Sequence, residues 1–281
     1  MPKNTLMRWH STSKLLTHQA KLQLSYNKAM AYQTNFYPCD FDFPNPLTCD
    51  DDGLVGIGAD LSPQTLRYAY AHGFFPWFNE GDPIMWWSPN PRCVIYPKTF
   101  TPSKTLARRL KNSDWQLSVN RDFPAVIQAC SEARVYAQGT WITKDMTAAY
   151  NRLHTLGDAV SIEVWQKEAL IGGLYGIKLG QAFFGESMFH RVTDASKVAF
   201  FGLMKLGELS NFAWVDCQLP NDHLLSLGAS VISRTAFLRD LPNQVFQTSC
   251  DWSALYGQKI AVKDVFLAKP VVNNKESLIL V

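Results

Sequence analysis

Three polar side chains near the ends of expected strands are the first candidates for chemistry in this sequence. Asp216 and Gln218 stand two positions apart at the end of one such strand, so their side chains are expected on the same face. A carboxylate beside an amide can hold that amide and aim it at a reacting group. Taken alone, the pair favours a structural interpretation, in which Asp216 caps the next helix and Gln218 lies in a surface loop. Glu186 follows another expected strand, where a binding role and an ion pair with Lys197 are equally compatible with the sequence.

Positive charge is segregated along the chain. Residues 83–113 contain no acid, whereas residues 29–66 contain acids and no Lys or Arg. The basic residues of the first stretch are Arg92, Lys98, Lys104, Arg108, Arg109 and Lys111. Such segregation produces a local field that attracts a polyanion, although the net charge is only +3. On charge alone, a solvated helix face is an equally good interpretation.

Aromatic residues are concentrated between the acidic and the basic stretch. Residues 74–78 read Phe-Phe-Pro-Trp-Phe, and residues 84–89 read Ile-Met-Trp-Trp-Ser-Pro. These runs are too aromatic and too often interrupted by Pro for ordinary strands. They predict one packed platform that is partly core and has some ring edges free to stack on a ligand.

The composition predicts an ordered globular protein without a membrane or metal partner. The chain has 281 residues, of which 47% are hydrophobic and 18% are charged. No apolar run approaches the roughly 18–20 residues of a membrane span, and the basic first thirty residues lack the apolar core of a secretory signal, which favours the cytoplasm. The six Cys residues are scattered singly, so buried free thiols are expected rather than zinc ligands or disulfides.

The periodicity predicts a mixed α/β chain with a larger domain that follows a smaller, aromatic-rich one. Helices are expected at 62–73, 103–111, 123–133, 144–156, 195–209 and 222–227. Strands are expected at 159–165, 169–177, 182–186, 212–217 and 231–232. We predict a flexible basic extension at 1–35, a small α+β domain at 36–95, a catalytic domain at 96–240 and a partly ordered tail at 241–281.

The order of elements from residue 159 to residue 232 resembles that of N-acetyltransferase-like (GNAT) folds. Those enzymes bind coenzyme A through backbone amides of a Gly-rich turn before the central helix. Here the corresponding residues 189–194 read Phe-His-Arg-Val-Thr-Asp, without Gly. We therefore expect this fold without coenzyme A or another cofactor, and an acyl donor that arrives by a different route.

Seven short strings occur in a defined order along the chain. They are GFFPW at 73–77, WWSPNPR at 86–92, GTWIT at 139–143, GGLYG at 172–176, GESMF at 185–189, ASK at 195–197 and DCQ at 216–218. Together they resemble the leucyl/phenylalanyl-tRNA–protein transferases of bacteria, over roughly residues 43–238. Thr101-Pro102 and Val160 stand where that family commonly has His, and neither position is expected to do chemistry.

The resemblance implies a reaction and roles for four residues. The enzyme would move Leu, Phe and, less readily, Met from aminoacyl-tRNA to the α-amino group of proteins that begin with Lys or Arg, in the N-degron pathway of protein degradation. The donor ester is already activated, and an α-amine with a pKa of about 7.7–8.0 is partly neutral at pH 7. We expect the Gln218 amide oxygen to accept from the incoming amine while Asp216 fixes and polarises Gln218. Glu186, assisted by Asn221, would bind the acceptor.

The resemblance also implies binding residues for the donor. Apolar side chains that are equally compatible with a plain core are the candidates for the pocket that takes Leu or Phe: Leu174, Phe183, Met188, Phe200, Leu203 and Val215. Trp77 and Trp141 are expected to stack on the terminal adenosine. The basic side chains expected to hold the acceptor-stem phosphates are Lys104, Arg108, Arg109 and Lys111. We expect a monomer, because a charged tRNA and a protein must bind together.

Three other functions remain compatible with the sequence. An acetyl-CoA-dependent N-acyltransferase on the same fold would need a coenzyme A site. A non-catalytic tRNA-binding protein would use the basic stretch and the aromatics without turnover. A peptidoglycan-type aminoacyltransferase would differ in its acceptor.

Overall fold

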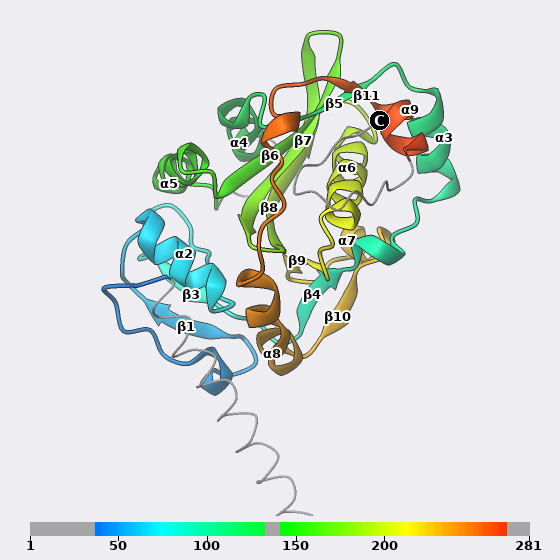
Figure 1. Ribbon diagram of the computed structural model, residues 1–281. Helices are drawn as coiled ribbons and strands as arrows, with labels where there is room; N and C mark the ends of the chain where they lie inside the picture. The colour runs from blue at the N-terminus through cyan, green and yellow to red at the C-terminus, as the bar shows by residue number, and fades with distance from the viewer. Residues whose placement is uncertain (1–36, 133–140, 269–281) are drawn as a thin grey trace, which may run out of the picture.

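The computed structural model describes residues 37–132 and 141–268 and contains two β-sheets (Figure 1). The smaller sheet is antiparallel, with the order β1 (Leu54–Ile57), β3 (Met85–Trp87), β2 (Phe75–Pro76). Helix α2 (Pro63–Ala71) begins where the Ser62 hydroxyl accepts a hydrogen bond from the backbone of Thr65, 3.2 Å away. It ends before Gly73, whose φ of +82° suits Gly. The predicted extension at 1–35 lies outside the described residues.

Within the described residues, the larger sheet has eight strands. Their order is β10 (Ser230–Ile232), β4 (Arg92–Ile95), β9 (Val215–Gln218), β8 (Ala182–His190), β7 (Ala169–Leu179), β6 (Ala159–Gln166), β5 (Gln116–Val119) and β11 (Ile260–Ala261). Strands β8 and β9 pair in parallel, and the other neighbours are antiparallel. The long helix α6 (Ala195–Leu209) connects the two parallel strands, as a parallel pair requires.

Helices cover both faces of the larger sheet (Figure 1). One face carries α6, with α3 (Lys104–Asn112) and α9 (Val262–Leu267) beside it, and the other carries α4 (Phe123–Glu132) and α5 (Lys144–Thr155). The core on the α4 and α5 side also includes apolar residues of the smaller sheet, α2 and α8 (Arg234–Val245). The smaller sheet therefore shares a core with the larger one. No helix in the described part of the chain combines the length and apolar character of a membrane span.

The predicted elements from α2 to β10 are confirmed within a few residues, and so is their order after residue 159, where α7 (Asp222–Ser226) precedes β10. Two regions differ. Strand β4 belongs to the larger sheet, although the predicted boundary after residue 95 places it in the N-terminal domain. Residues 241–268 are also ordered: α8 continues to Val245, β11 pairs with β5, and Trp252, Leu255 and Val262 are buried. Single apolar anchors among polar residues leave no periodic signal, so the sequence did not predict them.

Candidate active site

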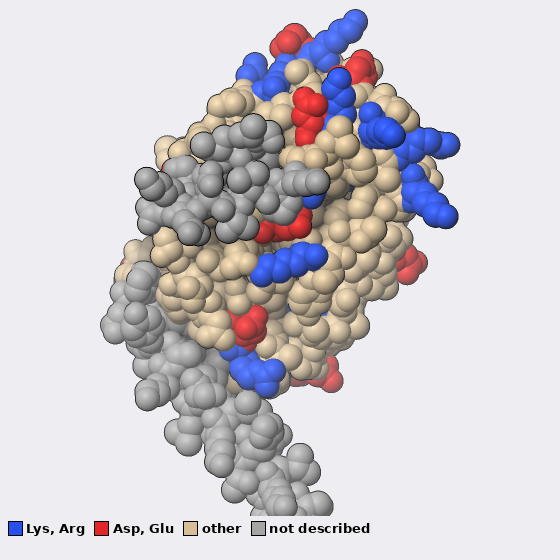
Figure 2. Space-filling view, turned by 45° about the vertical axis from the view of Figure 1, so that its right-hand side comes forward, with Lys and Arg blue, Asp and Glu red and all other residues tan. Residues whose placement is uncertain are grey.

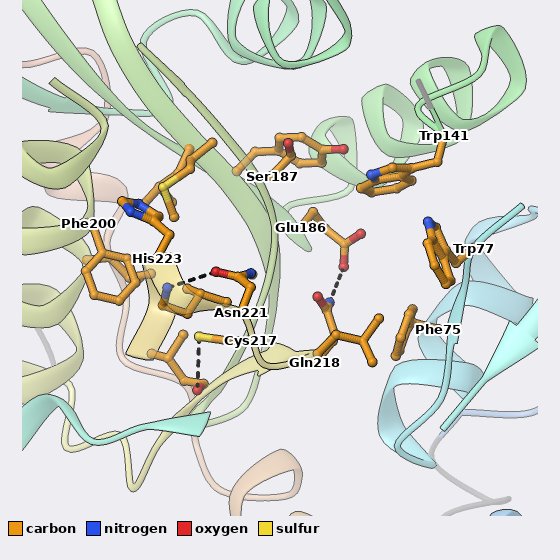
Figure 3. A pocket seen from close by; sticks show the side chains of 18 of the residues that line it. Phe75, Trp77, Trp141, Glu186, Ser187, Phe200, Cys217, Gln218, Asn221 and His223 are labelled. Atoms are coloured by element: carbon orange, nitrogen blue, oxygen red, sulfur yellow. Dashed lines mark hydrogen bonds between the residues drawn. The ribbon is translucent and has the colours of Figure 1, made fainter. Parts of the chain in front are cut away.

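A cavity of about 400 Å³ is lined by residues of both sheets, α6 and α7. Figure 3 shows three zones along it. Phe200 lies at a largely apolar end, where His223 is its neighbour, and Phe75, Trp77 and Trp141 gather at the opposite, aromatic end. Polar side chains, Gln218 among them, lie between the two ends. The cavity can therefore hold an elongated ligand with an apolar group at one end and a planar group at the other.

Two β-bulges place polar side chains in the middle zone. On β8, Gly185 pairs with Gly176 and Ser187 pairs with Tyr175, so Glu186 is an extra residue. Glu186 and Ser187 consequently both line the cavity, although strict alternation would put them on opposite faces. A second irregularity lies on the neighbouring strand β9, just before Gln218. Bulges are frequent next to active sites because they redirect side chains in this way.

Asp216 lies beneath the cavity wall in a buried ion pair with Arg92. The Arg92 Nε and Nη2 atoms donate to the two carboxylate oxygens at 2.8 Å and 2.6 Å, and both side chains are at most 1% exposed. A third hydrogen bond joins Arg92 Nη1 to the carbonyl of Gly73 at 3.2 Å. The guanidinium also lies over the rings of Phe75 and Phe237, at 5.0 Å and 4.5 Å from their centroids. Arg92 therefore ties the smaller sheet and α8 to β9.

Asp216 holds the backbone of Gln218, and not its side-chain amide as we expected. Its Oδ1 atom accepts from the Gln218 N–H at 3.0 Å, and Gln218 takes a left-handed conformation with φ of +58°. Asp216 does not line the cavity, whereas Gln218 does. Asp216 also does not cap the next helix, because Asn221 is the N-cap of α7, with its Oδ1 atom 2.9 Å from the backbone nitrogen of Leu224. Asp216 is therefore placed to position Gln218.

Glu186 is the centre of a hydrogen-bond network that joins α2, α5, β8 and β9. Its Oε1 atom accepts from the Tyr70 hydroxyl at 2.7 Å and from Gln218 Nε2 at 3.1 Å. Its Oε2 atom accepts from the Tyr150 hydroxyl at 3.0 Å, and the two phenols also hydrogen-bond to each other. Burial raises the pKa of Glu186 to about 8, although the donors Tyr70 and Tyr150 oppose that shift.

The geometry of the network also favours a neutral carboxyl. Three oxygen–oxygen contacts join Glu186, Tyr70 and Tyr150, and only two hydroxyl protons serve them when the carboxyl is ionised. A protonated Glu186 supplies the third. The alternative ion pair of Glu186 with Lys197 is wrong, since Lys197 Nζ lies 3.3 Å from the carboxylate of Asp194.

The raised pKa of Glu186 predicts that the protein loses stability as the pH rises. Between the ordinary pKa of a Glu, near 4.5, and the folded value of about 8, the folded state binds one proton that the unfolded state has released. The contribution of Glu186 to the free energy of unfolding is fully present below pH 4.5. It falls by at most about 1.4 kcal/mol per pH unit until pH 8. Chemical unfolding of the wild type and of Glu186→Gln at pH 5, 6.5 and 8 measures it. The free-energy gap between the two proteins should change with pH, and a constant gap would contradict the assignment.

Comparison with known proteins identifies the family. The model of the leucyl/phenylalanyl-tRNA protein transferase family matches residues 94–242, and the model of its N-terminal domain matches residues 59–90. The chain belongs to this family. The N-terminal match ends before β4 and the other match begins within it, and together they include β2 and β3 of the smaller sheet and most strands of the larger one.

Curated relatives carry the same name as the family. A leucyl/phenylalanyl-tRNA–protein transferase of Psychrobacter arcticus is 50% identical over 229 residues, covering 79% of this chain and 85% of the relative. Those of Pseudomonas aeruginosa and Legionella pneumophila are 50% and 47% identical, covering 70% and 75% of this chain and 88% and 93% of theirs. This family member is therefore an aminoacyltransferase. Among solved structures, L-PGS from Bacillus licheniformis aligns with a TM-score of 0.35 at 11% identity over 57% of this chain and 52% of that one, which carries no argument.

Five of the six residues predicted for the donor side-chain pocket of this transferase line the cavity: Leu174, Met188, Phe200, Leu203 and Val215. Phe183 does not. It is fully buried, and its ring stacks on that of Trp252, with centroids 6.4 Å apart. Trp252 belongs to the segment that we predicted to be a partly ordered tail, so this contact could not be predicted.

The predicted stacking residues of the transferase both line the aromatic end of the cavity. Trp77 is 42% exposed, and its ring packs edge-on against Trp87 with centroids 6.1 Å apart. Trp141 lines the same end and is partly buried. Phe75, which we did not single out, lies beside them.

The predicted phosphate-binding residues share helix α3, whose apolar face, Leu106 and Leu110, is buried. The exposed basic residues of this cluster are Lys104, Arg108, Arg109 and Lys111. Figure 2 shows Lys and Arg side chains gathered along this side of the surface. Arg109 already has partners in the protein. Its Nε atom lies 3.8 Å from the carboxylate of Asp194, and its guanidinium carbon lies 5.1 Å from the ring centroid of Trp115.

Sequence reasoning missed the residues that support the site from a distance. Tyr70 and Tyr150 come from helices α2 and α5 and resemble ordinary core positions, and only the fold brings them to Glu186. Arg92 was grouped with the basic residues of the acid-free stretch 83–113, although its place at the end of the string WWSPNPR set it apart, and it is fully buried. In the described ranges, no group of three or more His, Cys, Asp or Glu side chains is arranged to hold a metal ion.

Proposed function

We propose that this protein transfers Leu, Phe and, less readily, Met from aminoacyl-tRNA to the α-amino group of proteins that begin with Lys or Arg. The observation that carries the proposal is the three-zone cavity, in which Gln218 and Glu186 lie between an apolar and an aromatic end. The family name supports a leucyl- or phenylalanyl-tRNA donor and a protein acceptor. We further propose that the protein acts as a monomer in the cytoplasm, in the N-degron pathway.

The donor fits the cavity from end to end. Its Leu or Phe side chain would enter the apolar end, where Met188 and Phe200 line the wall. Such a pocket discriminates by only about 1–3 kcal/mol per methylene, so it accepts Leu, Phe and Met together. The terminal adenosine would stack at Trp77 and Trp141, and the α3 cluster would hold the acceptor stem by its phosphates.

The reaction needs orientation more than acid–base strength. The acceptor amine attacks the ester carbonyl, its carbon–nitrogen bond forms, and the bond to the ribose oxygen breaks. The Gln218 amide oxygen would accept from the attacking amine, since its nitrogen already donates to Glu186 at 3.1 Å. An amide is too weak a base to keep the proton, so the ribose oxygen or water would take it.

The acceptor would bind at Glu186. A cationic Lys or Arg beside this carboxyl favours its ionised form, so binding would release the proton that the network holds in the free protein. Asn221 lines the same cavity, but its side-chain oxygen caps α7, which leaves it a smaller part than we expected.

We propose that the larger sheet has an N-acetyltransferase-like fold. The start of α6, however, argues against the alternative function in which this fold uses acetyl-CoA. The backbone N–H groups of Arg191 and Val192 donate to the carbonyl of Ile171, at 2.7 Å and 3.4 Å. Asp194 adds a carboxylate at the N-cap of the helix. Amides already used within the fold, beside a negative charge, form a poor pyrophosphate site.

Incubation with Leu-tRNA and a peptide that begins with Arg tests the proposal. Mass spectrometry should show one leucyl residue added at the peptide N-terminus, and the same peptide with an acetylated α-amine should remain unchanged. Acetylation of the peptide from acetyl-CoA would support the coenzyme A alternative instead. Binding of Leu-tRNA without any transfer would support the non-catalytic alternative.

The α3 cluster predicts salt-dependent tRNA binding. Neutralising one phosphate contact with Arg108→Gln should reduce the slope of log affinity against log salt by about one. Lys167→Gln is the matched control, because Lys167 is an exposed cation in the turn between β6 and β7. Filter binding of Leu-tRNA between low and moderate salt gives the slopes. Equal slopes for both variants and the wild type would place the tRNA elsewhere.

A further inference from the structure

Ser187 is a buried hydroxyl in the cavity wall that makes no hydrogen bond to any described residue. It is only 9% exposed, and its Oγ atom has no partner within the described part of the chain. Its place on the cavity wall follows from the bulge at Glu186, which brings two consecutive β8 residues to the same wall. A buried hydroxyl without a partner destabilises the fold because it has lost its hydrogen bonds to water, so folded proteins retain few of them.

Three polar side chains of the same cavity already have hydrogen-bond partners within the protein. Glu186 receives hydrogen bonds from Tyr70, Tyr150 and Gln218. Asn221 caps α7. Ser187 is therefore a cavity-facing group with its full hydrogen-bonding capacity, one donor and two acceptor sites, left for a ligand.

The position of Ser187 indicates which part of a ligand it meets. Figure 3 places it between Phe200 at the apolar end and Trp141 at the aromatic end. A donor with its side chain at the first end and its adenosine at the second places its α-carbon and ester in between. The α-amino group on that carbon donates hydrogen bonds and needs acceptors. The ester carbonyl needs a donor, which Gln218 Nε2 can supply because only one of its two N–H groups goes to Glu186.

We propose that the Ser187 hydroxyl accepts a hydrogen bond from the α-amino group of the donor amino acid and so orients its ester toward Gln218. The assignment rests on the proposed function. It makes Ser187 a specificity-determining residue that favours donors with a free α-amine over those without one. It also explains why a polar group without a partner in the protein is retained in the wall beside an apolar pocket.

A binding cycle with two probes tests the assignment. The first probe is phenylalanine in amide linkage to 3′-amino-3′-deoxyadenosine, which does not react, and the second carries 3-phenylpropanoyl and lacks the α-amine. The wild type should prefer the first by about 10-fold or more, as expected for a hydrogen bond to a charged group. Ser187→Ala should bind both probes equally, because removing the Ser187 hydroxyl and removing the α-amine of the probe abolish the same hydrogen bond.

Two further measurements separate recognition from folding. Ser187→Ala should leave the thermal unfolding midpoint unchanged or raise it, since it removes a hydroxyl that has no partner in the free protein. Ser187→Thr keeps the hydroxyl and should keep the preference. An unchanged preference in Ser187→Ala, or a lower midpoint in that variant, would overturn the assignment while the proposed function stands. Failure of the wild type to bind the first probe would instead contradict both.

Discussion

Replacing Asp216 with Ala is expected to lower the free energy of unfolding by about 3–5 kcal/mol and to abolish measurable transfer. The stability effect follows from Arg92, whose guanidinium would keep its burial under two aromatic rings but lose its counter-ion. The loss of transfer follows from the Gln218 N–H, which would lose its acceptor at 3.0 Å. Urea unfolding and the peptide assay measure the two effects on the same preparation.

A double variant separates these effects. Arg92→Met combined with Asp216→Leu replaces the ion pair with apolar side chains of comparable size, an exchange that is often neutral or stabilising. It should recover most of the unfolding free energy and none of the transfer, because no acceptor for the Gln218 backbone returns. Recovery of transfer together with stability would show that Asp216 acts only through folding.

Replacing Gln218 with Gly should lower transfer by about 100-fold or more while the unfolding free energy changes little. Gly adopts the left-handed φ of +58° without strain, so the variant removes the side chain and leaves the backbone turn intact. The loss should appear in kcat more than in the apparent affinity for either substrate, because the amide is proposed to orient the attacking amine. Single-turnover transfer from Leu-tRNA to the peptide measures it.

Gln128→Ala is the matched control for this prediction. Gln128 is an exposed glutamine on α4 whose amide hydrogen-bonds only to Glu132 among the described residues, and its loss should not affect transfer. Near-normal transfer by Gln218→Gly would remove Gln218 from the chemistry. A loss that appears only as weaker donor binding would reassign it to recognition.

The sequence predicted the residues that line the cavity better than those that support them. Gln218, Glu186 and two of the donor-pocket residues, Leu174 and Met188, lie in strings with a recognisable order, and their strands follow from alternating apolar residues. Alternation, however, predicts a regular strand, and the bulge that exposes both Glu186 and Ser187 to the cavity breaks it. Gly176 opposite the bulge was the available signal, because a Cβ there would lie 2.2 Å from the carbonyl oxygen of Phe184.

Two charged residues have roles that their sequence context does not predict, because both are buried. Arg92 was counted among the basic residues of the acid-free stretch 83–113, yet it is fully buried and its partner Asp216 is 124 residues away. Asp216 in turn resembled a helix cap or a direct partner of the Gln218 amide. Pairs of distant charges leave no local pattern, so only the folded chain shows them.

The contacts of Arg92 make the position of Gln218 depend on complete folding of the chain. The carbonyl of Gly73 and the ring of Phe75 belong to the N-terminal part of the chain that forms the smaller sheet, while Asp216 and Phe237 lie on β9 and α8, much later in the sequence. Until both ends have docked, Arg92 lacks part of its cage and Gln218 lacks a fixed backbone. We therefore expect a partly opened chain to be inactive, because Gln218 would lack the fixed backbone that the proposed reaction requires.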